Sequence, residues 1–224
     1  HGGPTDANAH PHVVDGGKLA VVHNGIIENF AELKTELAEK GYTFKSETDT
    51  EVAATLLADF VHGAGEGDLT EAMRLTCNRL EGAFTLLALH ADFPDRIVAA
   101  RRNSPLVIGL GEGENFLGSD VSGFIDYTKN AVEMANDQIV TITATSYDII
   151  DFAGNKAQGK PFKVEWDAAA AEKGGFSSFM EKEIHDQPTA VRDTLMGRFD
   201  ENGKLTLDEL HIDETVLRSI DKII

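Results

Sequence analysis

The pair Asn24-Gly25 follows an apolar segment at residues 18–23 (KLAVVH) and precedes a helical pattern. Asn-Gly is among the commonest turn pairs, so a turn is the first alternative for these two residues. The second alternative is chemical. A side-chain NH2 beside a glycine N–H can put two donors on one oxygen, as an oxyanion hole for acyl transfer requires. Because the helical pattern begins within a few positions, we expect a strand-to-helix corner at this pair and not a two-residue hairpin.

Asp49 is a second candidate, in the segment SETDTEV at residues 46–52. A carboxylate near a helix N-terminus stabilises the helix, and taken alone the segment favours this structural role for Asp49. A functional carboxylate at the same place would instead accept a charge-assisted hydrogen bond from a cationic group, such as a substrate ammonium.

Histidines near the N-terminus raise the question of a metal site. His10 and His12 have a spacing that can place two imidazoles on one metal, with His23 or His1 as a third ligand. No thiolate or acidic ligand lies at a diagnostic spacing. We therefore expect no metal, and predict that these histidines order a polar loop or contact a substrate.

Two other features favour structural roles. The glycines of GLGEGENF at residues 109–116 lack the third glycine of a dinucleotide fingerprint, so we expect a turn between strands and no cofactor. Cys77 falls on an apolar helix face with no base beside it in the sequence. It is predicted to be a buried structural thiol.

The composition limits the partners of the chain. Its 224 residues include 38 Asp and Glu against 20 Lys and Arg, a formal net charge of -18, so nucleic acid and anionic membranes are poor partners. No apolar run approaches the roughly 20 residues of a membrane span. One cysteine is compatible with a reducing compartment, and we expect a cytoplasmic protein.

The elements that would position these residues follow from capping and periodicity. Capping-box spacings at Asn29, Thr48 and Asp68 predict three helix starts, and YTFKSE at residues 42–47 alternates like a half-buried strand. From residue 82 to about 164 short β-rich runs alternate with turn residues, interrupted by a short helix over 122–128 that Asp120 or Ser122 would cap. Helices followed by a strand-rich half predict an α+β domain with largely antiparallel sheet.

The domain boundaries follow from composition. We predict one domain over residues 1–166, a linker rich in Ala, Gly and Ser over 167–178, and the start of a second domain over 179–224. In this last part a helix is expected, with Pro188 in its first turn after Asp186.

Together, HGGPTDANAHPH, VVHNGIIENF, SETDTEV and SPLVIGLGEGENFLGSD resemble the glutaminase domain of class II glutamine amidotransferases. FMEKEIHDQP in the tail resembles the segment that leads into the sugar isomerase domain of those members that aminate fructose 6-phosphate. The resemblance implies the four-layered αββα sandwich of N-terminal nucleophile hydrolases. It also implies full-length relatives that are commonly homodimers through the isomerase domain.

The resemblance implies a mechanism as well. An N-terminal cysteine attacks the amide of glutamine, with its own α-amino group as general base. Asn24 and Gly25 would donate to the oxyanion, while His1, Gly25 and Asp49 would bind glutamine, Asp49 through the α-ammonium. The ammonia released would convert fructose 6-phosphate to glucosamine 6-phosphate.

The same comparison places the nucleophile upstream of His1, outside this chain, so the chain alone is expected to hydrolyse no glutamine. Three alternatives remain open. They are another class II amidotransferase with a phosphoribosyl or amino acid acceptor, a non-catalytic domain that binds glutamine, and a metal hydrolase using His10 and His12.

Overall fold

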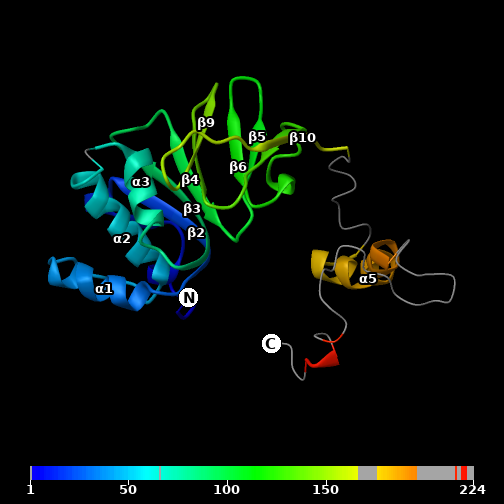
Figure 1. Cartoon of the computed structure of the whole chain (residues 1–224), viewed down its shortest axis with the longest axis horizontal. Coiled ribbons are helices and arrows are strands. Elements are labelled where there is room, and N and C mark those ends of the chain that lie inside the picture. The colour runs from blue at the N-terminus through cyan, green and yellow to red at the C-terminus, as the bar shows by residue number, and fades with distance from the viewer. Residues whose placement is uncertain (1, 66, 166–175, 196–214, 216–217, 221–224) are drawn as a thin grey trace. The chain divides into compact units, whose positions relative to one another are not determined.

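The computed structural model describes residues 2–65, 67–165, 176–195, 215 and 218–220 (Figure 1). The chain divides into two compact units, His1–Ala169 and Ala170–Ile224. His1 and most of the predicted linker over 167–178 lie outside the described residues.

The first unit contains two antiparallel sheets. Sheet A has the order β1-β2-β3-β4-β8-β9, and its strands are His12–Val14, Leu19–Ile27, Gly82–His90, Ile97–Arg102, Gln138–Ile142 and Tyr147–Asp151. Sheet B has the order β10-β7-β5-β6, with strands Lys160–Lys163, Asn130–Glu133, Val107–Leu110 and Asn115–Gly118. The predicted turn at GLGEGENF is the connection between β5 and β6.

Three helices cover one face of sheet A (Figure 1). They are α1 (Phe30–Glu39), α2 (Asp49–His62) and α3 (Leu69–Cys77). In α1 the residues Leu33 and Leu37, four positions apart, are buried against this face, as the periodicity predicts. Sheet strands contribute alternate residues to the same core, among them Leu19 and Val21 of β2.

Two further apolar clusters fill the space between the remaining layers. Ala99 and Val140 of sheet A pack with Ile108 and Val132 of sheet B, so the two sheets lie face to face. The opposite face of sheet B is covered by a segment containing the 3₁₀ helix η3 (Val121–Gly123). The layers of the first unit are thus, in order, the helices α1 to α3, sheet A, sheet B and the segment that contains η3.

The predicted helix over 122–128 was too long. Only η3 forms, and Asp120 caps it by accepting from the N–H of Ser122 at 2.8 Å. The following residues Phe124 and Ile125 are buried against sheet B without continuing the helix.

The predicted strand over residues 42–47 was also wrong, because its backbone bonds to a side chain. The N–H groups of Lys45 and Ser46 donate to the carboxylate of Glu51. At the start of α1, Asn29 makes no cap hydrogen bond. Its amide instead binds the backbone of Arg79 and Glu81, which ties α1 to the segment before β3.

The second unit contains α5 (Phe179–Leu195). Pro188 lies inside this helix and not in its first turn, which corrects the prediction. A proline there cannot donate to the carbonyl four residues earlier, that of Ile184.

Part of the face of sheet A opposite the helices is exposed among the described residues. Val13, Val22, Ile26 and Leu89 on β1 to β3 lie on this face, and Ile26 is 58% exposed. None of the described helices is long and apolar enough to cross a membrane.

Candidate functional site

Asn24 and Gly25 lie inside strand β2, which continues to Ile27. Asn24 is opposite Thr85 of β3 and Gly25 is opposite Phe84. The expectation of a strand-to-helix corner was therefore wrong, and a turn is excluded as well. Pairing with β3 extends the strand past the Asn-Gly pair, and this long-range partner is not visible in the local sequence.

The hydrogen-bond phase of this ladder fixes the direction of the Gly25 N–H. Glu28 N donates to Glu81 O at one end and Ala91 N donates to Lys18 O at the other. Hydrogen-bonded pairs alternate in an antiparallel ladder, so Asn24 exchanges bonds with Thr85, whereas Gly25 and its partner form a non-hydrogen-bonded pair. The N–H of Gly25 therefore points away from β3. It lies on the edge of β2 that faces β1, but past residues 19–21, which are the ones that pair with β1.

Only glycine fits at position 25. Its φ is 132°, a conformation that L side chains rarely adopt, and an added Cβ would lie 2.1 Å from the carbonyl oxygen of Ala83. The close approach of β3 is thus possible because position 25 has no side chain.

We expect Gly25→Ala to lower the free energy of unfolding by about 3 kcal/mol, since it adds backbone strain and a clash with β3. Chemical denaturation measures this difference. Gly123→Ala is the matched control, because an added Cβ at Gly123 meets no atom within 4 Å. Equal stability of the two variants would contradict the proposed clash.

Asp49 begins α2 and reaches the same edge of β2. Its Oδ2 accepts from the N–H of Ile27 at 2.8 Å, two residues after Gly25. Alternate residues of a strand direct their N–H groups to the same edge, so Gly25 and Ile27 face the side on which the carboxylate lies. Asp49 also lines a small cavity of about 140 Å³ together with Ile26, Ile27, Phe30 and Glu47.

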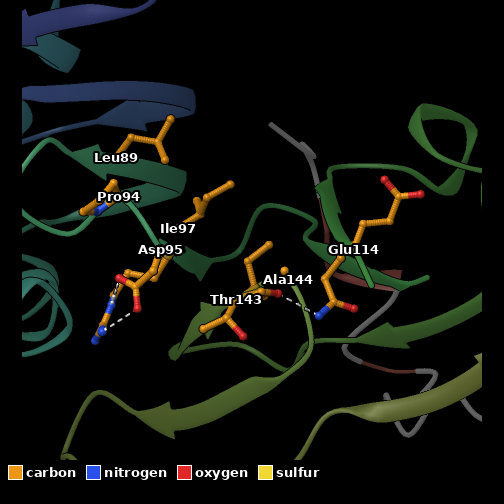
Figure 2. Close-up of a pocket in the computed structure, with 10 residues that line it drawn as sticks. Leu89, Pro94, Asp95, Ile97, Glu114, Thr143 and Ala144 are labelled. Atoms are coloured by element: carbon orange, nitrogen blue, oxygen red, sulfur yellow. Dashed lines mark hydrogen bonds and ion pairs between the residues drawn. The ribbon is translucent and has the colours of Figure 1, made fainter. Parts of the chain in front are cut away.

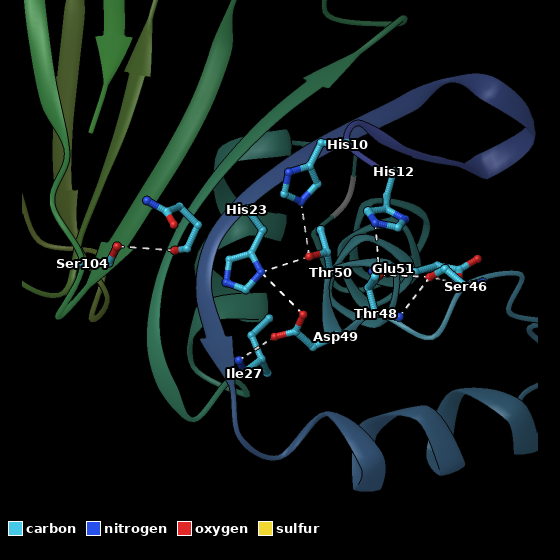
Figure 3. Close-up of polar contacts among 11 residues, drawn as sticks. His10, His12, His23, Ile27, Ser46, Thr48, Asp49, Thr50, Glu51 and Ser104 are labelled. Carbon is cyan, nitrogen blue, oxygen red and sulfur yellow. Dashed lines mark hydrogen bonds and ion pairs between the residues drawn. The ribbon is translucent and has the colours of Figure 1, made fainter. Parts of the chain in front are cut away.

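Buried polar side chains surround the start of α2 (Figure 3). The side chain of His23 is 1% exposed, with Nδ1 3.0 Å from Thr50 Oγ1 and 3.8 Å from Asp49 Oδ1. Burial lowers the pKa of His23, although the carboxylate of Asp49 favours the protonated ring. A neutral imidazole therefore lies beside the carboxyl group of Asp49.

Of the other candidate metal ligands, His10 and His12 contact different threonines. His10 Nε2 is 3.5 Å from Thr50 Oγ1, and His12 Nε2 is 3.0 Å from Thr48 Oγ1. In the described part of the chain no group of three or more His, Cys, Asp or Glu side chains could hold a metal ion. His10 and His12 instead join the start of β1 and the residues just before it to the start of α2.

Glu51 has a structural role in the same turn. Its carboxylate accepts from the N–H groups of Lys45 and Ser46 and from the Ser46 hydroxyl, at 2.6 to 3.0 Å. The predicted capping box is half formed, because Thr48 accepts from the N–H of Glu51. Burial raises the pKa of Glu51, but these hydrogen bonds outweigh it and the pKa is lowered overall.

We expect Glu51→Gln to cost about 1–3 kcal/mol of unfolding free energy at neutral pH, because the charged acceptor is lost. A lowered pKa gives stability that is full above the ordinary glutamate pKa of 4.5 and is lost as the pH falls through the lowered value. Denaturant titrations across this range should show the variant and the parent converging at low pH. A difference independent of pH would refute the role of the charge.

A larger pocket of about 390 Å³ lies where β3 ends and β4 begins (Figure 2). It is lined by Leu89, Pro94, Asp95, Arg96, Ile97, Glu114, Asn115, Ile142, Thr143 and Ala144, of which Glu114 and Asn115 belong to the segment GLGEGENF. Arg96 pairs with Asp95 at 3.0 Å, and Asn115 donates to the carbonyl of Thr143. These polar groups are engaged with each other, and we assign the pocket no function.

Cys77 is fully buried in the core between the helices and sheet A. Burial raises the pKa of its thiol far above the ordinary value, so it stays protonated and unreactive. The prediction of a structural thiol is confirmed.

Comparison with known proteins gives a family for most of the first unit. Residues 4–126 match the family described as glutamine amidotransferase domain. The whole chain is 81% identical to a Corynebacterium diphtheriae protein and 58% identical to a Streptomyces coelicolor protein, both named glutamine–fructose-6-phosphate aminotransferase (isomerizing). In each case it spans 36% of the relative's length.

Solved structures of similar fold agree with the α+β architecture. Glutamine phosphoribosylpyrophosphate amidotransferase from B. subtilis matches with a TM-score of 0.56 and 23% identity, over 69% of this chain and 34% of that one. A structure described as the allosteric regulatory enzyme of purine biosynthesis matches with a TM-score of 0.56 and 24% identity, over 67% and 32%. At these identities the likeness establishes the fold alone.

Proposed function

Because the chain belongs to the glutamine amidotransferase family, we propose that Asn24, Gly25 and Asp49 form its glutamine site. Asn24 and Gly25 donate to the oxyanion that forms when the amide carbon of glutamine is attacked. The carboxylate of Asp49 accepts a charge-assisted hydrogen bond from the α-ammonium of the substrate. The observation that carries the proposal is the shared edge of β2, where Gly25 presents its N–H and Ile27 binds the Asp49 carboxylate.

The proposed chemistry needs a thiol nucleophile. Attack on the amide carbon breaks the C–N bond and releases ammonia, and water then hydrolyses the acyl-enzyme to glutamate. Cys77 is the only cysteine of the 224 residues, and its burial removes it from this role. We therefore assign the nucleophile to no residue of this chain.

The full-length protein is proposed to use the ammonia to convert fructose 6-phosphate to glucosamine 6-phosphate in the cytoplasm, through an isomerase domain. The names of the relatives and the similarity over the whole chain support this substrate. A homodimer held together by the isomerase part is proposed as well, and light scattering of the full-length protein measures it.

Glutamate release from glutamine by the full-length protein, with and without fructose 6-phosphate, tests the proposal. We expect release that increases when the sugar phosphate is present. Release that requires a phosphoribosyl acceptor instead would favour another amidotransferase, and binding of glutamine without release would favour a non-catalytic domain.

A further inference from the structure

A buried hydroxyl lies on the carbonyl side of the peptide group that joins Asn24 to Gly25. The hydroxyl of Ser104 donates to the carbonyl oxygen of Asn24 at 3.4 Å (Figure 3). Ser104 is 8% exposed and belongs to the turn that follows β4. By the phase of the ladder, the same carbonyl also accepts from the N–H of Thr85, so two donors bind one oxygen.

The turn that carries Ser104 is held in place from two sides. The hydroxyl of Thr85, the cross-strand partner of Asn24, donates to the carbonyl of Pro105 at 3.1 Å. On the other side Asn103 and Asn136 exchange two hydrogen bonds of 3.0 Å each. Because both neighbours of Ser104 are fixed, its hydroxyl meets the Asn24 carbonyl with little further loss of conformational entropy.

We propose that Ser104 is a positioning residue of the oxyanion hole, acting through the Asn24–Gly25 peptide. In a trans peptide the C=O and the N–H point in opposite directions, so a donor on the Asn24 carbonyl fixes the direction of the Gly25 N–H. Hydrogen bonds in a chain also polarise one another, which makes this N–H a stronger donor. The inference rests on the proposed function and adds Ser104 to that site.

The length of the Ser104 bond fits an unliganded site. At 3.4 Å it exceeds the usual 2.5–3.0 Å of a hydroxyl donor. Hydrogen bonds of a catalytic site are often long before the substrate binds and shorten in the complex. Negative charge on the oxyanion would polarise the Asn24–Gly25 peptide and so strengthen the hydrogen bond from the Ser104 hydroxyl to the Asn24 carbonyl. Ser104 is therefore expected to act mainly in the transition state.

The expected kinetic signature is a lower kcat with an unchanged KM. In the full-length protein Ser104→Ala should lower kcat for glutamate release about two- to tenfold, the effect of one net hydrogen bond. Ser104→Thr keeps a hydroxyl and should retain most of the rate. Ser146→Ala is the matched control, since its hydroxyl bonds to Thr143 in the turn between β8 and β9.

A second readout does not depend on turnover. In full-length protein labelled with ¹⁵N-glycine, the Gly25 amide resonance should shift in Ser104→Ala and stay near its parent position in Ser104→Thr and Ser146→Ala. An unmoved resonance in Ser104→Ala would overturn the inference, as would equal loss of kcat in the Ala and Thr variants. If the resonance moves but the parent protein releases no glutamate, the proposed function fails, and with it the catalytic meaning of Ser104.

Discussion

Asn24→Ala in the full-length protein is expected to lower kcat for glutamate release about a hundred- to a thousandfold, with little change in KM. The side-chain amide of Asn24 is exposed, and no hydrogen bond occupies it among the described residues. It is therefore free to donate to an oxyanion, which exists in the transition state and not in bound glutamine. Truncation removes stabilisation of the transition state alone.

Initial rates over a range of glutamine concentrations measure this effect. Asn155→Ala is the control, because that amide binds Asp151 in a surface turn and should leave both constants near the parent values. A rate reduced less than tenfold by Asn24→Ala, or reduced equally by the control, would remove Asn24 from the oxyanion hole.

The second large effect is expected at Asp49, on binding. Asp49→Asn should raise the KM for glutamine about a hundredfold, since loss of one member of a buried charge pair typically costs 2–5 kcal/mol. The asparagine oxygen can still accept from the N–H of Ile27, so the link to β2 is preserved. The variant therefore removes the charge and keeps the fold.

Glu51→Gln gives the matched comparison, in the same turn of α2. Its carboxylate binds the backbone of Lys45 and Ser46, so this variant should lose stability and keep the KM of the parent. Direct binding of glutamine by calorimetry would separate affinity from rate. An Asp49→Asn variant that binds glutamine as tightly as the parent would contradict the assigned role.

Local sequence patterns predicted the starts of α2 and α3 and most strands of both sheets. Thr48 and Asp68 accept from N–H groups in the first turns of their helices, as their spacing suggests. Such contacts span two or three residues and can be read directly from the sequence. The prediction for segment 42–47 failed because the backbone N–H groups of Lys45 and Ser46 donate to the carboxylate of Glu51 and not to a neighbouring strand.

The sequence indicated which residues could do chemistry better than it indicated where in the fold they lie. Asn24, Gly25 and Asp49 were identified from their residue types, but β2 pairs with a strand some sixty positions away, which local spacing cannot show. Ser104 was missed for the same reason, since 80 residues separate it from Asn24. No pattern at position 104 distinguishes this hydroxyl from one in an ordinary turn.

The central claim is that this chain handles glutamine for an amino transfer, and one measurement tests it most directly. The full-length protein is incubated with fructose 6-phosphate and glutamine labelled with ¹⁵N at the side-chain amide, beside unlabelled ammonium. We predict that the amino sugar formed carries the label. An unlabelled product, or no amino sugar, would contradict the assignment.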